Sequence, residues 1–74
     1  MISAEQVREH MVVVASDGET IGKVDHIEGA NKIKLTKGDS PDGKHHFIPL
    51  DWVENVDDRI HLGKAAKDVR AQWN

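Results

Sequence analysis

The sequence predicts a small all-β fold, a barrel or roll of five to six antiparallel strands with a short helix at each end. Short runs rich in Val, Ile and Leu recur along the chain, and turn-forming residues separate them. From Lys64 onward the apolar spacing changes from that of a strand to that of a helix. We expect the 74 residues to form a single domain, residues 1–74, because a chain of this length has room for one core.

The N-terminal segment resembles the start of a helix. Ser3 is a good N-cap residue, and Gln6 follows it at the spacing of a capping box. We therefore expect a short helix over residues 4–10. A helix of so few turns is unstable in isolation, and this one would therefore depend on packing against the rest of the chain.

A hairpin is expected next. Residues 11–15 form a β-branched run that leads into Asp17-Gly18, which predicts a type I′ turn with positive φ at both residues. The following strand, residues 20–28, contains Gly22. Its apolar positions do not keep a strict period of two, which predicts a bulge near this glycine.

Two more strands follow the hairpin. Residues 32–37 alternate cleanly, so Ile33 and Leu35 are expected to point inward. Residues 38–44 are rich in turn formers and predict an exposed loop. The next strand, residues 45–50, contains Pro49, which cannot donate to a ladder and so belongs on an edge or at a barrel corner.

The last third predicts a turn, a strand and a helix. Asp51 is expected to cap a single turn, with Glu54 reaching back to it. Residues 59–62 form a short strand with two apolar side chains inward. A terminal helix of about ten residues follows, because its apolar residues recur at helical spacing. This helix is expected to lie across an open end of the barrel.

Composition limits the classes of function. The net charge is −3 and the isoelectric point is near 5.9, which disfavours a general nucleic-acid binder. There is no cysteine, and no apolar run approaches a membrane span or a signal sequence. We expect a soluble cytoplasmic protein that does not contact a membrane.

The sequence offers little material for catalysis or metal binding. Among the five histidines, His45 and His46 are adjacent in a predicted strand, so their side chains leave on opposite faces and do not share one ion. There is no cysteine nucleophile, no Gly-x-Ser-x-Gly motif and no glycine-rich phosphate loop. We expect no catalytic residue, no metal and no cofactor, and thus no enzyme.

Four residues are candidates for binding a partner: Trp52, Phe47, Lys32 and Lys34. Two placements of Trp52 remain open. It either points outward beside Phe47 as an interface anchor, or packs under the terminal helix against Trp73. The lysines are expected on a solvated face of the third strand.

Residues 14–26 and 45–53 resemble a family of short bacterial proteins known only as a domain of unknown function, and the likeness extends from about residue 2 to residue 73. More distantly, Asp17-Gly18 with residues 21–24, and residues 48–50 with Val53 and Val56, are similar to the PRC-barrel pattern. That small β-barrel occurs in the H subunit of the photosynthetic reaction centre and in a ribosome maturation factor. The resemblance implies a PRC-barrel-like docking module without a catalytic site. We expect neither the photosynthetic nor the ribosomal function, because this sequence shows neither the membrane helix nor the second domain of those larger PRC-barrel proteins.

Three functions remain as hypotheses. The leading one is a protein–protein interaction or adaptor module, which includes self-association. The first alternative is RNA or ribosome-precursor binding through a lysine face made of Lys32, Lys34, Lys37 and Lys44. The second is a small-ligand or metal-dependent protein, which requires a pocket around His26, His46 and His61.

Overall fold

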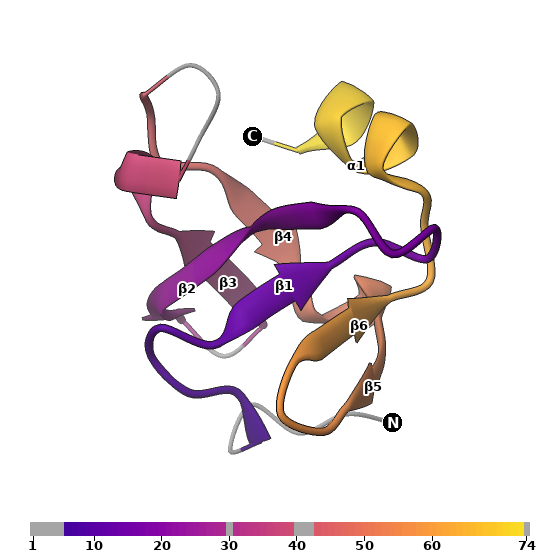
Figure 1. Ribbon diagram of the computed structural model, residues 1–74. Coiled ribbons are helices and arrows are strands. Elements are labelled where there is room, and N and C mark those ends of the chain that lie inside the picture. Colours follow the sequence, from indigo (N-terminus) through magenta and orange to yellow (C-terminus); the bar gives the residue numbers. More distant parts are fainter. Residues whose placement is uncertain (1–5, 30, 40–42, 74) are drawn as a thin grey trace.

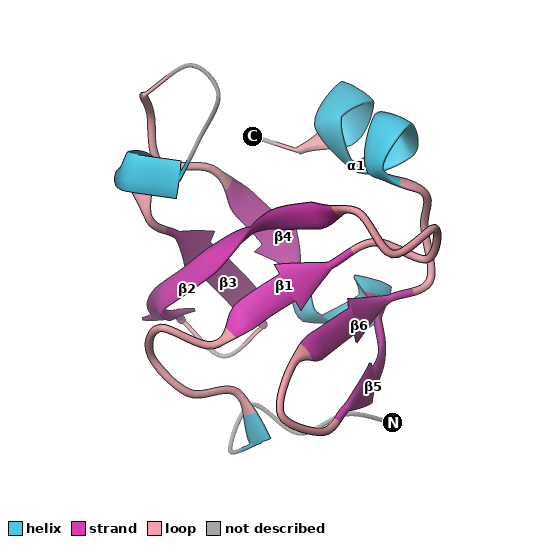
Figure 2. Ribbon diagram, in the orientation of Figure 1, coloured by secondary structure: helices cyan, strands magenta, loops and turns pink. Residues whose placement is uncertain are grey.

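The structure is a computed structural model that describes residues 6–29, 31–39 and 43–73. These residues form one six-stranded sheet and one α-helix, α1 (Ala66–Gln72) (Figures 1 and 2). The strands are β1 (Val12–Val14), β2 (Thr20–Glu28), β3 (Lys32–Leu35), β4 (Phe47–Pro49), β5 (Val53–Val56) and β6 (Ile60–Leu62). The prediction of a mostly β fold with a C-terminal helix is therefore confirmed.

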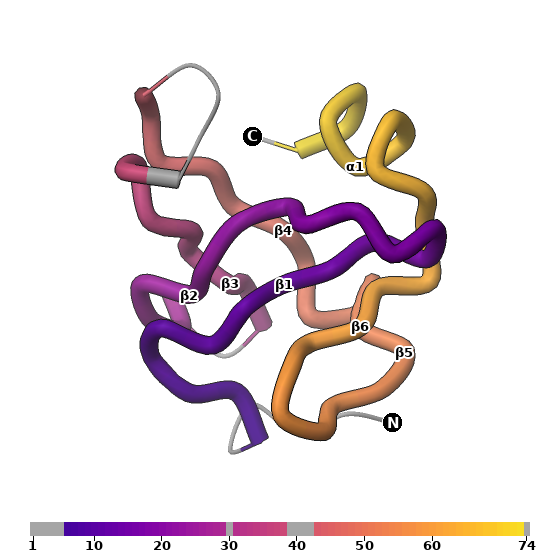
Figure 3. The backbone as a smooth tube through the Cα atoms, in the orientation of Figure 1, coloured from indigo at the N-terminus to yellow at the C-terminus, as the bar shows by residue number. Residues whose placement is uncertain are grey.

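The strand order is β4-β3-β2-β1-β6-β5, and the sheet formed by the described strands does not close into a barrel. Neighbouring pairs are antiparallel except β1 and β6, which lie side by side in Figure 3 and run parallel. In this parallel pair Val13 lies opposite Ile60 and Val14 opposite His61. The expected count of five to six strands is confirmed, and the one departure from the expected antiparallel order is the β1–β6 pair. After β4 the chain turns a corner, and the β5–β6 hairpin joins β1 from the side, so β6 follows the direction of β1.

The predicted N-terminal helix is not formed in residues 7–10, while its cap Ser3 lies outside the described residues. His10 has a φ of 67°, which an α-helix does not allow. Its backbone N–H donates to the carbonyl of Val24 at 2.7 Å, and the N–H of Val24 donates to the carbonyl of Met11 at 3.0 Å. The helix prediction is wrong here because the backbone pairs with β2 instead of with itself.

The hairpin between β1 and β2 is confirmed, but its turn differs from the predicted type I′. Gly18 has the expected positive φ, 85°, whereas Asp17 does not. The N–H of Gly18 donates to the carbonyl of Ala15 at 2.9 Å, and that of Ala15 donates to the carbonyl of Glu19 at 2.8 Å. This is a three-residue loop with a left-handed glycine. Asp17 keeps negative φ, and its carboxylate accepts a bond from the N–H of Glu19 at 3.2 Å.

The predicted bulge near Gly22 is confirmed. Val13 lies opposite Gly22 and Val14 opposite Thr20, so Ile21 is the extra residue on β2. Ile21 is 2% exposed and Val24 is 1% exposed. The bulge thus lets two apolar residues three positions apart reach the same core.

The core consists of aliphatic side chains from all parts of the sheet and from the helix. The predicted inward residues of β3 and β6 are all buried. From α1, Ala66 and Val69 join this core, as the helical spacing predicted. The largest fully buried side chains are those of Ile33, Ile48, Ile60, Leu62, Val13, Val24 and Val69.

The chain between β4 and β5 departs from the expected capped turn. A single 3-10 turn, η3 (Leu50–Trp52), follows Pro49, which occupies the N-cap and makes no side-chain capping bond. Asp51 lies inside this turn instead of capping it, so the predicted cap is wrong. Pro49 lies on the edge strand β4, as expected for a residue without an N–H.

Helix α1 crosses one open end of the sheet, as predicted, although it is shorter than ten residues (Figure 1). Arg70 forms an ion pair with Glu19 and donates to the carbonyl of Thr20 at 3.3 Å, both in the β1–β2 hairpin. At its C-cap, Trp73 stacks on His46, just before β4. Within the described ranges, no helix is long and apolar enough to cross a membrane.

Candidate functional site

The first candidate surface is the solvent side of β2, β3 and β4. Ile33 and Ile48 lie opposite each other and are fully buried, so the residues on either side of them in β3 and β4 face away from the core. Two rows of paired residues result across the three strands. The outer face, as we call it, consists of His26 with Lys34 and Phe47, and of Glu28 with Lys32 and Pro49.

Phe47 is the distinctive residue of the outer face. It is half-buried and lies directly opposite Lys34, yet it does not belong to the core that the described residues form. Neither Lys34 nor the exposed Lys32 makes an ion pair with any residue in the described ranges. Three of the four predicted partner-binding residues therefore share one surface, with an aromatic ring beside available cations.

The fourth, Trp52, lies apart from this surface. It is half-buried and packs against the core, and its carbonyl accepts a bond from the N–H of Gly63 at 2.9 Å. The ammonium of Lys64 lies 5.3 Å from the centre of the indole ring, a cation–π distance. Of the two placements left open for Trp52, neither is found as stated: the ring lies against the core and Lys64, and the ring that stacks on Trp73 is that of His46.

The wider lysine face expected for RNA binding is only partly assembled. Lys32 and Lys34 share the outer face. Lys37 begins a separate 3-10 turn, η2 (Lys37–Asp39), and Lys44 precedes β4 in the connecting segment.

The histidines do not gather at one pocket. His26 lies on the outer face, where its Nε2 is 2.9 Å from a carboxylate oxygen of Glu28. His46 stacks on Trp73, and His61 lies on β6 at the other side of the sheet. No group of three or more metal-ligating side chains occurs within residues 6–29, 31–39 and 43–73.

A bulge in β2 places a cluster of polar side chains at the edge of the outer face. Val24 lies opposite Leu35 and His26 opposite Lys34, so Asp25 is the extra residue. The Asp25 carboxylate lies 3.6 Å from His26 Nδ1 and 3.8 Å from the Nδ1 of His45. His45 Nδ1 is also 2.9 Å from the Leu35 carbonyl oxygen. These histidines are thus already engaged with neighbouring groups.

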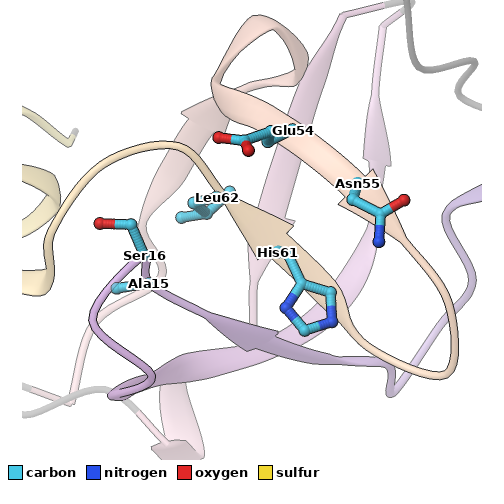
Figure 4. Close-up of a pocket in the computed structure, with 6 residues that line it drawn as sticks. All are labelled: Ala15, Ser16, Glu54, Asn55, His61 and Leu62. Carbon is cyan, nitrogen blue, oxygen red and sulfur yellow. The ribbon is translucent and has the colours of Figure 1, made fainter.

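The second candidate surface is a pocket of about 310 Å³ where the β5–β6 hairpin meets the end of β1 (Figure 4). A bulge in β5 shapes it, because Val53 lies opposite Leu62 and Asn55 opposite His61, leaving Glu54 as the extra residue. Two consecutive side chains of β5 therefore reach the same pocket. The lining residues are Ala15, Ser16, Glu54, Asn55, His61 and Leu62.

Sequence reasoning missed this pocket. Glu54 was expected to serve as a capping partner, and Ser16 simply precedes the predicted Asp17-Gly18 turn. Neither feature indicates that the two meet, since the pairing of β6 with β1 brings them together.

His61, one of the residues that line this pocket, is hydrogen-bonded on its outer side to Asp57. The backbone N–H of Arg59 donates to Asp57 Oδ1 at 2.9 Å, and His61 Nε2 lies 3.0 Å from the same oxygen. Both contacts favour the ionised carboxylate and hold the pKa of Asp57 below its ordinary value. Because a carboxylate only accepts, Nε2 carries the proton of this bond, and in the neutral ring Nδ1 is an acceptor.

Asp57 itself borders a neighbouring hollow of about 480 Å³. It is lined by Gln6, Arg8, Met11, Val56, Asp57 and Asp58.

A comparison with family models gives the relationship of the chain to known proteins. The model of DUF2171, described as an uncharacterised protein conserved in bacteria, matches residues 7–70. This chain belongs to the DUF2171 family. The matched region of this DUF2171 protein contains all six strands and most of α1, and so both candidate surfaces. A search of curated proteins finds no match. The expected membership of a bacterial domain family is confirmed, while the PRC-barrel likeness remains a resemblance.

Proposed function

We propose that this DUF2171 protein is a non-catalytic cytoplasmic module that binds a protein, either a different chain or a second copy, through its outer face. The observation that carries the proposal is Phe47. This half-buried aromatic side chain lies on the solvent side of the sheet, outside the core, and its exposed part is available to a partner.

The residues around Phe47 are arranged like those of a small protein–protein interface. Lys34 lies opposite it in the next strand, and Pro49 lies two positions along the same strand. An apolar centre with a charged rim is typical of protein–protein interfaces. Full burial of an exposed phenylalanine side chain contributes about 1.5–3 kcal/mol, and the half-buried Phe47 can contribute a part of that when a partner covers its exposed part, so it is the expected anchor.

The non-catalytic part of the proposal is supported by the pocket geometry. Ser16 and His61 both line the pocket, but no hydrogen bond joins these two residues. Figure 4 shows the Ser16 hydroxyl pointing away from the imidazole ring. A serine nucleophile needs a base within hydrogen-bonding reach, which this arrangement does not provide.

The test compares three variants. Phe47→Ala removes the anchor, Lys34→Glu reverses the adjacent charge, and Lys67→Glu on exposed α1 is the matched control. Sedimentation over a range of concentrations detects a second copy, and affinity capture from bacterial cytosol detects another protein.

We expect the association to be retained in the control and lost in both outer-face variants. A monomer at every concentration, together with a captured set of proteins unchanged by Phe47→Ala, contradicts the proposal.

A further inference from the structure

We propose that the pocket between β5, β6 and the end of β1 binds a positively charged nitrogen group, an ammonium or a guanidinium. Its floor is apolar, because Ala15 and Leu62 are only 3% and 2% exposed. Its rim is polar, with Glu54 and Asn55 from β5 and His61 from β6 (Figure 4). An apolar floor with a few convergent polar groups is the usual composition of a ligand pocket.

The rim presents acceptors. The Glu54 carboxylate has no ion pair or hydrogen bond with another residue in the described parts of the chain. His61 Nε2 is bonded to Asp57, and Figure 4 shows the other ring nitrogen on the side of Ser16. This Nδ1 is an acceptor in the neutral ring.

Charge decides which ligand these acceptors suit. An ammonium offers three donors and a guanidinium five, and either makes charge-assisted bonds to a carboxylate. An anion would meet Glu54 directly and the ionised Asp57 behind His61. The net charge of −3 favours cations further. The volume of about 310 Å³ is at the small end of ligand pockets, which fits a diamine or one lysine or arginine side chain.

The test is a titration of isotope-labelled protein followed by the amide NMR signals of Ser16, Asn55 and His61. The probes are putrescine, N-acetyl-lysinamide and N-acetyl-argininamide, and N-acetyl-norleucinamide is the neutral control. We expect saturable shifts with the three cations and none with the neutral amide. Equal affinity for putrescine and lysinamide indicates a free amine as the ligand, and tighter binding of the amino-acid amides indicates a partner's side chain; both outcomes support a cation site.

Two variants make the test specific. Glu54→Gln is expected to weaken binding about tenfold, the effect of one charge-assisted hydrogen bond. Glu28→Gln removes another exposed carboxylate, far from this pocket on the outer face, and is expected to leave amine binding unchanged. The proposal is overturned if the neutral amide shifts the same signals, or if the two variants bind alike.

Gly63→Ala is a second way to disturb Glu54. A Cβ at position 63 would lie 3.0 Å from a Glu54 carboxylate oxygen, so the flexible end of Glu54 must move. We expect weaker amine binding with an unchanged melting temperature, and unchanged binding would count against the proposal. Phe47→Ala is expected to leave amine binding intact. The proposal for this pocket and the proposal for the outer face are therefore tested independently.

Discussion

The imidazole of His46 stacks on the indole of Trp73, with ring centroids 4.0 Å apart and planes inclined by 8°. His46 precedes the edge strand β4, and Trp73 is the C-cap of α1. Because α1 follows β6 in the chain, this contact ties the helix across the sheet to the opposite part of the strand order. The end of α1 is therefore held by a tertiary contact.

Replacing Trp73 with alanine is expected to destabilise the protein. It removes the stacking on His46 and the packing of a half-buried side chain against the core. We expect a loss of about 1–3 kcal/mol in the free energy of unfolding. Urea unfolding followed by circular dichroism measures this, with Gln72→Ala on the exposed side of α1 as the control. Equal stability of both variants would show that the stack contributes nothing.

The left-handed glycine of the hairpin gives a second prediction. Gly18 has a φ of 85°, so Gly18→Val forces a β-branched residue into a conformation that it resists. We expect a loss of about 1–3 kcal/mol in stability. Gly22→Ala is the matched control, since a Cβ there meets nothing within 4 Å. If thermal melting is unchanged by Gly18→Val, the hairpin register is wrong.

Two neighbours on β4 test which side of the sheet is the core. Ile48 is fully buried, so Ile48→Ala is expected to cost about 2–5 kcal/mol of stability. Phe47 lies outside the core, so Phe47→Ala is expected to change stability by less than about 1 kcal/mol. Denaturant unfolding of both variants provides the comparison. The reverse order of effects would mean that β4 faces the other way.

The stability of the protein is expected to depend on Asp57 at low pH. The N–H of Arg59 and then His61 hold the pKa of this carboxyl below its ordinary value of 3.8. A lowered folded-state pKa stabilises the protein above the unfolded pKa, and this stabilisation is lost as pH falls through the folded pKa. The wild type should therefore exceed Asp57→Asn in stability at pH values above the ordinary carboxyl pKa of 3.8, and lose that advantage as the pH falls from there through the lowered pKa of Asp57. A stability difference independent of pH over this range would contradict the assignment.

Local patterns predicted the parts of the fold that depend on local physics. The alternation around Ile33 and Leu35 gave their inward placement, and the helical spacing of Ala66 and Val69 predicted α1. The irregular spacing around Gly22 indicated the bulge, because an extra residue changes which side chains face the core.

What the sequence did not show depends on contacts between distant segments. The strand β5 was not expected, because the bulge at Glu54 breaks its alternation. The parallel pairing of β6 with β1 has no local signature, although it creates the pocket beside Ser16. The left-handed His10 is stabilised by its bond to Val24, a partner that helix propensity cannot foresee. Of the predicted site residues, only Trp52 was separated from the rest, since η3 turns the chain away after β4.

Site-specific photo-crosslinking in bacterial cells tests the central claim most directly. A photoreactive phenylalanine analogue is placed at position 47 on the outer face, and at position 71 on exposed α1 as the control. We predict a discrete protein crosslink from position 47 that disappears with Lys34→Glu and is absent from position 71. No crosslink from position 47, or the same products from both positions, would contradict an interaction surface at Phe47.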